Sequence, residues 1–194
     1  MLLNRLSKII NNGTMIYIII KKEGEKNMAE REILLLGNKN LYEICKEISK
    51  DEIHKAKQIV ADLHDTMMNF RKKYGFGRAI AAPQIDEPYR VIYINFNDNS
   101  IALINPKLEL DETGKFEMWD DCMSFPGLEV KLFRYKKCKI YYKDLKWNDC
   151  IMEVTGDLSE LIQHEYDHLD GILAVQKAID NRSFRINEDK AGCF

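Results

Sequence analysis

The feature that most constrains this chain is the segment LIQHEYDHLDG at residues 161–171. His164 and His168 are four residues apart, and on an α-helix residues at this spacing lie one turn apart on the same face. Glu165 directly follows the first histidine. The order H-E-x-x-H is typical of a helix that binds a metal ion through both imidazoles and moves a proton with the glutamate. The segment therefore predicts a helix with a metal-binding face.

Two histidines do not complete a metal site, so a further ligand has to come from elsewhere in the chain. An alternative interpretation is that both histidines are simply packed or exposed. Glu165 between them and the apolar turn LSELI before them favour the ligand role. His54 and His64 are the remaining histidines, but they lie on a separate amphipathic segment, where we expect them at the surface.

Cys122, in the polar stretch WDDCMSFPG, is the next candidate ligand. Two nitrogens and one thiolate would leave a fourth position of the metal open for water. Taken alone, a cysteine is more often a buried structural thiol, and the setting of Cys122 is what distinguishes it. The odd number of cysteines and the absence of a C-x-x-C pair favour free thiols in a reducing compartment. We expect buried structural thiols at Cys45, Cys138, Cys150 and Cys193.

Hydrophobic periodicity predicts an α+β fold with a mostly antiparallel sheet. Residues 53–74 place apolar side chains at three- and four-residue steps, which indicates an amphipathic helix that ends at Gly75. Two pairs of β-rich segments separated by turn residues indicate two hairpins, 89–95 with 101–110 and 138–145 with 150–155. There is no βαβ alternation that would indicate a parallel sheet.

Length and charge limit the organisation and the partners. A chain of 194 residues is long enough for one domain with a sizeable core. The formal charge of −2, with Lys and Glu interspersed, gives no basic patch, so we expect no direct nucleic-acid partner. The longest apolar run, residues 15–20, is too short to span a bilayer, so we expect no membrane association.

The chain divides into three parts. Residues 1–27 read as an N-terminal extension of unknown role, either an over-called start before Met28 or a targeting piece. Residues 28–180 are expected to form a single catalytic domain. The polar tail at 181–194 offers few apolar side chains, and we expect it to be loosely held.

Three motifs carry a resemblance to a known family. GRAIAAPQ at residues 77–84, DDCMS at 120–124 and QHEYDH at 163–168 resemble the three motifs of the peptide deformylases. The likeness runs from about Met28 to about Ile179 and includes SFPG after the cysteine and HLDG after the last histidine. It implies an α+β fold in which mostly antiparallel sheets pack around the helix that carries H-E-x-x-H.

The resemblance implies hydrolysis of the formyl group from N-formylmethionine at the start of new polypeptides. Cys122, His164 and His168 match the ligands of one divalent metal ion per chain. The resemblance implies that this ion is Fe²⁺ in the cell. The same ligands accept Zn²⁺, Ni²⁺ or Co²⁺. The implied partner is an N-formylated peptide or nascent chain, with transient ribosome association as an open expectation. The implied location is the cytoplasm, or an organelle if residues 1–27 are a transit peptide.

Three further residues match the catalytic groups of the family. Glu165 matches the general base that later acts as an acid. Gln84 matches a side-chain amide that stabilises the developing oxyanion, and the backbone N–H of Met123 matches a second donor. Without the motif, Gln84 would read as a surface turn amide after Pro83.

The sequence departs from the family around the substrate. Arg78 stands where the family has a small aliphatic residue, Ala79 replaces a glycine, and Asp120-Asp121 replaces Glu-Gly. Asp157 occupies a position that is usually Leu or Phe and lines the methionine pocket. The substrate-binding candidates are therefore Gly77, Arg78, Ala79, Asp121 and Asp157.

Two interpretations of Arg78 and Asp157 stay open. They could form an ion pair that narrows or re-specifies the methionine pocket, since a matched buried pair is tolerable where a single charge is costly. Alternatively, Asp157 caps the histidine helix in a capping box with Glu160, and Arg78 extends to solvent. The function has alternatives too, namely a deformylase-fold amidohydrolase for another N-formyl or N-acyl amine, or a catalytically weak metal-binding homologue.

Overall fold

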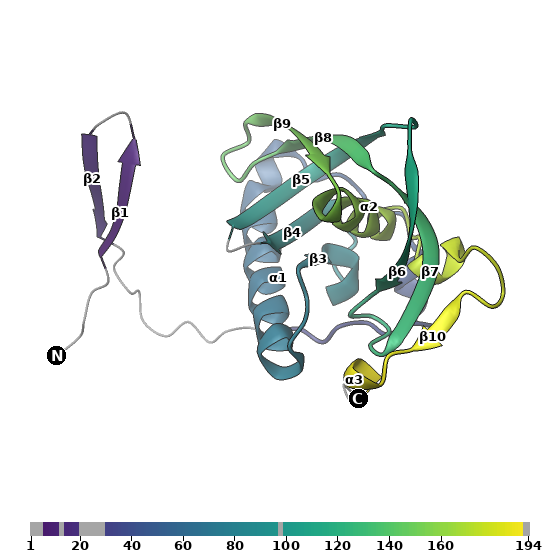
Figure 1. The fold of residues 1–194 in the computed structure, drawn as a ribbon. Coiled ribbons are helices and arrows are strands. Elements are labelled where there is room, and N and C mark those ends of the chain that lie inside the picture. Colours follow the sequence, from purple (N-terminus) through teal and green to yellow (C-terminus); the bar gives the residue numbers. More distant parts are fainter. Residues whose placement is uncertain (1–5, 12–13, 20–29, 97–98, 192–194) are drawn as a thin grey trace.

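The architecture consists of antiparallel sheets and two long helices, α1 (Ile53–Tyr74) and α2 (Asp157–Leu169) (Figure 1). The predicted α+β class is confirmed. The computed structural model describes residues 6–11, 14–19, 30–96 and 99–191. Within the N-terminal extension, β1 (Leu6–Asn11) pairs antiparallel with β2 (Thr14–Ile19). The role of residues 1–27 stays open.

Helix α1 has the bounds that the periodicity predicted. Its buried side chains include Ile59, Leu63, Met67 and Phe70, which follow one face at three- and four-residue steps. The helix ends at Gly75, which adopts φ 82° and donates its N–H to the Arg71 carbonyl at 2.8 Å. Glycine adopts this left-handed conformation without steric cost.

The larger sheet has the strand order β3-β4-β5-β8-β9, with every neighbouring pair antiparallel. Both predicted hairpins are present, as β4 with β5 and as β8 with β9. The strands are β3 (Ala79–Ala81), β4 (Val91–Phe96), β5 (Asn99–Leu110), β8 (Lys137–Lys143) and β9 (Asp149–Thr155).

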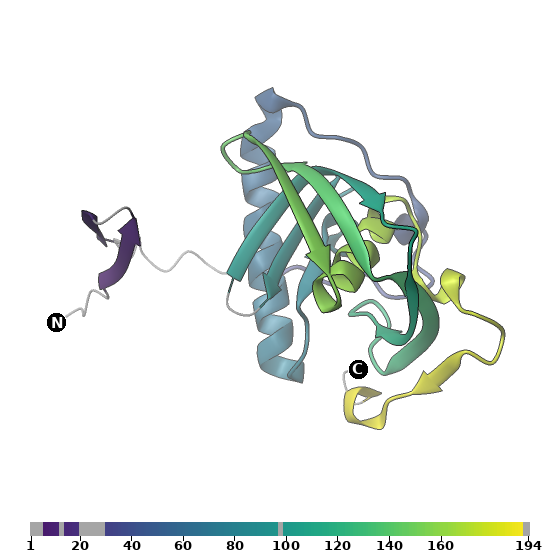
Figure 2. The ribbon, with the colours of Figure 1, turned by 45° about the horizontal axis from the view of Figure 1, so that its top comes forward.

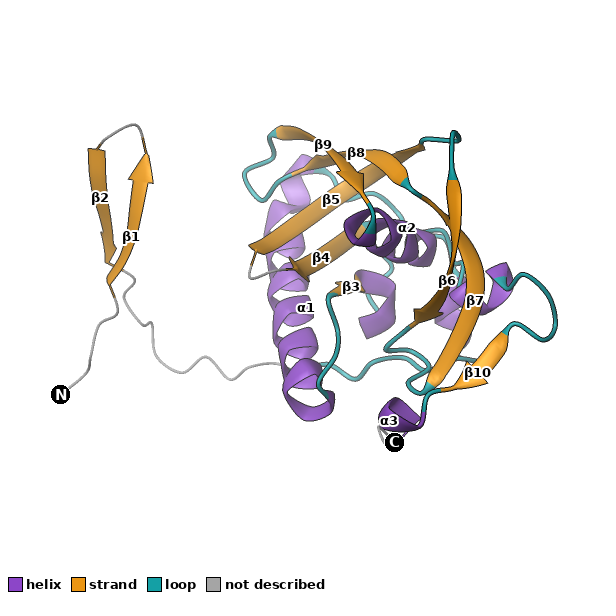
Figure 3. Cartoon of the chain, in the orientation of Figure 1, coloured by secondary structure: helices purple, strands orange, loops and turns teal. Residues whose placement is uncertain are grey.

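This sheet is covered on both faces, as Figures 1 and 3 show. Because side chains alternate along a strand, Val91 and Tyr93 of β4 join the core beneath α1, while Ile92 and Ile94 join the core beneath α2. Ile162 of α2 is fully buried in that second core, and its burial stabilises the fold by roughly 1.5–3 kcal/mol. The histidine helix is therefore held inside the molecule.

A second sheet, of order β10-β7-β6, lies on the other side of α2 (Figure 2). It consists of β6 (Lys115–Asp121), β7 (Leu128–Tyr135) and β10 (Phe184–Ile186). Because β6 ends directly before Cys122, this sheet sets the position of the cysteine relative to α2. The sequence analysis had not identified these three strands or β3.

Short elements complete the described chain. They are the 3₁₀ helices η1 (Lys39–Tyr42), η2 (Lys50–Glu52), η3 (Ala82–Ile85) and η4 (Ala174–Lys177), and the short helix α3 (Glu188–Ala191). Within the described residues, no helix is both long enough and apolar enough to cross a membrane.

The C-terminal tail is held more firmly than its polarity predicted. Strand β10 pairs with β7, and Ser183 is buried. The Glu129 carboxylate accepts hydrogen bonds from Arg185 and Asn187, both at 2.7 Å. The expectation of a loose tail is thus wrong for residues 183–190, because polar pairing replaces the missing apolar contacts. Residues 192–194 lie outside the described range.

The expectations for isolated cysteines and histidines are largely confirmed. Cys45 and Cys138 are buried thiols, whereas Cys150 is only partly buried. Cys193 lies outside the described residues. His54 and His64 are both exposed, as predicted for the surface of α1.

Candidate metal centre

Helix α2 presents three polar side chains to the interior. His164, Glu165 and His168 are exposed by 6%, 3% and 1%. Apolar residues of the same helix, such as Ile162, fix it in the core, so its polar face has no freedom to turn to solvent. Burying three ionisable groups together is costly unless they pair or bind a metal ion.

Cys122 meets the two histidines immediately after β6. Its Sγ lies 3.3 Å from His168 Nε2, and the ligand atoms of Cys122, His164 and His168 all lie within 4.8 Å of one another. One thiolate and two imidazoles suit a tetrahedral ion that keeps an open position. The structure therefore brings the three predicted ligands together in an arrangement that fits a divalent metal.

A buried carboxylate orients the first histidine. His164 Nδ1 lies 2.8 Å from Asp120 Oδ1, so the other ring nitrogen, Nε2, is left for a metal. Asp120 also accepts a hydrogen bond of 2.7 Å from Arg134, which is exposed by only 1%. Burial raises the pKa of Asp120, but His164 and Arg134 outweigh it and hold that pKa well below its usual range.

Arg134 links this carboxylate to a second one. Its Nη1 donates to Asp167 of α2 at 2.5 Å, and Lys177 donates to the same carboxylate at 2.6 Å. The sequence analysis missed Arg134. The signal was the alternation along β7, because Val130, Leu132 and Arg134 share one buried face.

Glu165 has the properties of a proton carrier. Its Oε2 is buried and has no hydrogen-bond partner among the described residues. Burial, as the largest effect, raises the pKa of Glu165 to about 7. A group that exchanges protons near neutral pH is suited to act as both base and acid.

Gln84 points its amide toward the cysteine. Its Oε1 accepts the Ala81 N–H at 2.9 Å, which fixes the side chain. Its Nε2 donates to Ser124 Oγ at 3.2 Å and lies 3.5 Å from Cys122 Sγ. Gln84 is only 1% exposed, so it is not the surface turn amide of the alternative interpretation.

Comparison with known proteins decides the family. The sequence model of the family described as polypeptide deformylase matches residues 30–183, which is most of the chain. The chain belongs to the peptide deformylase family. A peptide deformylase of Dictyoglomus thermophilum is 33% identical over 150 residues, covering 77% of this chain and 94% of the relative. One from Dictyoglomus turgidum is 34% identical over 149 residues, covering 77% and 93%.

Solved peptide deformylases share the fold. The Synechococcus elongatus enzyme in complex with actinonin has a TM-score of 0.73 at 27% identity and covers 82% of this chain and 86% of its own. The Met-Ala-Ser-bound enzyme of Acinetobacter baumannii has a TM-score of 0.70 at 25% identity, covering 77% and 99%. Peptide deformylases are metal-dependent hydrolases that remove the N-formyl group from newly made polypeptides, and this chain is one of them.

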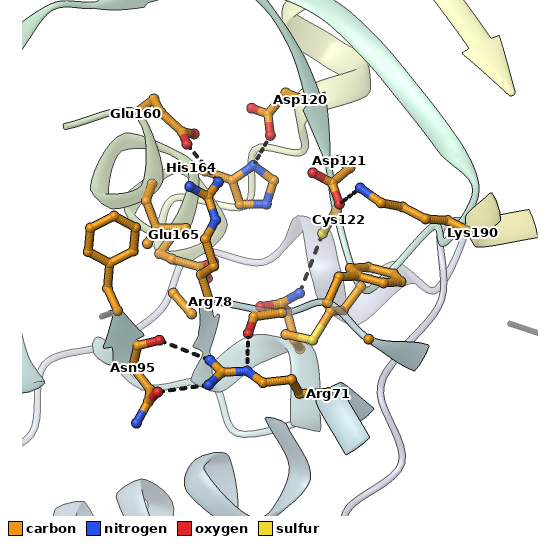
Figure 4. A pocket seen from close by; sticks show the side chains of 18 residues that line it. Arg71, Arg78, Asn95, Asp120, Asp121, Cys122, Glu160, His164, Glu165 and Lys190 are labelled. Carbon is orange, nitrogen blue, oxygen red and sulfur yellow. Dashed lines mark hydrogen bonds and ion pairs between the residues drawn. The ribbon is translucent and has the colours of Figure 1, made fainter. Parts of the chain in front are cut away.

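A cavity of about 730 Å³ opens beside the deformylase centre (Figure 4). The buried Met123 lines it, as do the predicted substrate-binding residues Gly77, Arg78, Ala79 and Asp121. Asp157 is the exception, because it is exposed at the first position of α2.

Gly77 and Ala79 of the first motif differ in backbone conformation. Gly77 adopts φ 115°, which favours glycine, and a Cβ there would lie 3.3 Å from Met123 Sδ, a contact that the methionine would have to relieve. Ala79 lies in β3 opposite Ile94 and has a negative φ. Its replacement of the family glycine therefore introduces no backbone strain.

The hypothesis that Arg78 pairs with Asp157 is wrong. Arg78 Nη2 instead donates to Glu160 Oε1 at 2.7 Å (Figure 4). Glu160 is four residues before His164 and so faces the centre, whereas Asp157 begins the helix at its exposed end. The capping alternative is wrong as well, because the N-cap is Gly156 and makes no side-chain cap. The i, i+4 spacing of Glu160 and His164 was the signal that could have found the partner.

Proposed function

We propose that Cys122, His164 and His168 bind one divalent metal ion and that this centre removes the formyl group of formylmethionine at nascent N-termini. The observation that carries the proposal is the convergence of the three ligand atoms within 4.8 Å in a buried site. The ion would supply the positive charge that polarises water and the formyl oxygen. We propose Fe²⁺ in the cell, with Zn²⁺, Ni²⁺ or Co²⁺ as substitutes, since the donor set accepts all four.

Glu165 moves the proton in this proposal. Its unpartnered Oε2 accepts a proton from the attacking water and then delivers it to the amine nitrogen that leaves. The buried setting, which raises the pKa of Glu165 to about 7, makes both transfers accessible near neutral pH.

Gln84 and Met123 stabilise the negative charge on the formyl oxygen. The Gln84 amide is held at its oxygen end by Ala81, so its N–H groups are already oriented before substrate arrives. The backbone N–H of Met123 follows the ligand Cys122 directly and is the second donor. Donors that need no reorganisation contribute most when charge develops in a site shielded from water.

The proposed setting is the cytoplasm, where formylated chains emerge from the ribosome, with a transient ribosome contact. The proposed catalytic domain is residues 28–180. If residues 1–27 prove to be a transit peptide, the site of action is an organelle. Localisation of the full-length chain and of a variant lacking residues 1–27, each fused to a fluorescent protein, separates these settings.

Formate release from formyl-Met-Ala-Ser tests the function. Protein prepared without oxygen and loaded in turn with Fe²⁺, Ni²⁺ and Zn²⁺ should release formate, and chelated protein should not. N-acetyl-Met-Ala-Ser serves as the matched control, because its extra methyl group should prevent turnover. Hydrolysis of the acetyl peptide alone would favour another N-acyl amine, and metal content without any turnover would favour the weak metal-binding homologue.

A further inference from the structure

The cavity next to the metal ligands is lined by several charged side chains. Arg78 and Glu160 both line the cavity and form an ion pair of 2.7 Å. Lys190 of the C-terminal tail also lines it and pairs with Asp121 at 2.9 Å. A part of a bound substrate that extends from the metal centre into this cavity therefore contacts side chains that can form hydrogen bonds.

The Arg78–Glu160 pair includes a residue of α2, the helix that carries both histidine ligands. Glu160 lies four residues, about 6 Å along the axis, before His164 on the same face. Its side chain is only 6% exposed, whereas that of Arg78 is 42% exposed. The carboxylate is thus the buried member of the pair and the guanidinium the more exposed one, and Figure 4 shows Arg78 directed toward Glu160.

This placement determines what the first side chain of a substrate contacts. Once a formyl group lies between Gln84 and the metal ligands, the neighbouring α-carbon is only two bonds from the formyl carbon. Its side chain has to use the adjoining cavity, and the ion pair is part of the lining of that cavity.

We propose that the Arg78–Glu160 pair determines specificity for the first side chain, so that the enzyme accepts a polar side chain such as glutamine about as well as methionine. The inference rests on the proposed function of the centre. An apolar pocket would reject glutamine, because its amide loses water without finding a partner. Here the guanidinium and the carboxylate offer a donor and an acceptor in place of that water.

Glutamine and methionine side chains have similar length and volume. Two peptides that differ only in this residue therefore test the effect of side-chain polarity alone. The experiment compares kcat/KM for formyl-Met-Ala-Ser and formyl-Gln-Ala-Ser. In the unmodified enzyme we expect the two values to agree within about tenfold, whereas an apolar pocket would discriminate by about 100-fold. A preference for methionine of 100-fold or more in the unmodified enzyme would overturn the inference.

The variant R78M/E160M makes the same wall apolar. Its preference for the methionine peptide should increase at least tenfold over that of the unmodified enzyme. The matched control is K139M/E153M, which removes an ion pair of 2.9 Å between β8 and β9, outside the cavity lining. An equal change in both variants, or none in R78M/E160M, would contradict the assignment.

A binding measurement separates this inference from the proposed function. Calorimetry with the deformylated peptides Met-Ala-Ser and Gln-Ala-Ser needs no turnover. Comparable affinities in the unmodified, metal-loaded protein that diverge in R78M/E160M would support the pair as specificity determinant even if no formate were released. Formate release with peptide affinities unchanged by the variant would support the proposed function and overturn the inference.

Discussion

At the scale of single residues, the account depends on charges that are buried in pairs. Arg134 is the centre of one such group, because it joins Asp120, which contacts a metal ligand, to Asp167 on α2. A buried pair gives little net stability over an apolar replacement, but removal of one partner leaves the others uncompensated. Arg134 therefore acts through Asp120 as a positioning residue for His164.

The substitution R134M should lower the free energy of unfolding by about 3–5 kcal/mol, because the buried Asp120 carboxylate loses its arginine and Asp167 keeps Lys177 alone. Urea denaturation followed by circular dichroism measures this change. K139M/E153M removes an exposed pair and should cost no more than about 1 kcal/mol. A loss for R134M as small as that of the control would show that the buried network does not need its cation.

Predictions for single residues succeeded where the spacing along a helix determined the face on which a side chain lies. They failed where no such spacing applied. His164 and His168 were assigned because a spacing of four residues defines one helix face, and the same rule would have placed Glu160, the partner of Arg78, on that face. Asp157 was misassigned because the first residue of a helix has no such constraint. Cys122 needed the resemblance, since no local rule places a loop cysteine beside His164, which is 42 residues later in the chain.

At the scale of elements, the tail and β7 form a pH-sensitive contact. Burial raises the pKa of Glu129, but hydrogen bonds from Asn187 and Arg185 outweigh it, so the pKa lies below its usual value. A carboxylate whose pKa is lowered by folding stabilises the folded state at pH values above its pKa in the unfolded chain. This stabilisation is lost as the pH falls through the pKa of the folded state. Docking of the tail should therefore weaken below about pH 4.

Trp119 reports on this contact, because the Arg185 guanidinium lies 4.2 Å from its ring centroid. In a W147F background, which leaves Trp119 as the single tryptophan, its fluorescence should change between pH 6 and pH 3 while the far-ultraviolet circular dichroism still shows helix. In W147F/E129Q this transition should be absent. An identical transition in both proteins would assign it to another group.

Elements with a strong period were predicted, and elements held by distant partners were not. Helix α1 and the hairpins β4–β5 and β8–β9 follow from local patterns. Strand β10 has three residues, all exposed, and exists because Glu129 and β7 hold it. No local signal in the tail could show that pairing.

At the scale of the whole molecule, a bound metal would add a further link between parts that already meet through packing and through the Asp120–His164 and Arg134–Asp167 pairs. Cys122 follows β6 of the smaller sheet, while both histidines belong to α2. A ligand that binds only the folded state stabilises it by about 2.7 kcal/mol at 100 times its dissociation constant. Removal of metal should therefore weaken the link between the smaller sheet and α2.

Thermal unfolding with and without Zn²⁺ measures this link. The unmodified protein should unfold at a higher temperature with the metal, and C122S should lose most of that increase. The control variant H54A/H64A removes two exposed histidines of α1 and should keep the increase in full. Equal stabilisation of C122S and the unmodified protein would place the bound Zn²⁺ elsewhere.

The most direct test of the whole account is formate release by E165Q from formyl-Met-Ala-Ser, measured beside its metal content. The proposal predicts that E165Q keeps one metal ion per chain, since Glu165 is no ligand, and that its rate falls by about 10²–10⁴-fold for want of a proton carrier. A metal-loaded E165Q that works at nearly the unmodified rate would contradict the account, because the buried carboxylate would then have no part in the chemistry.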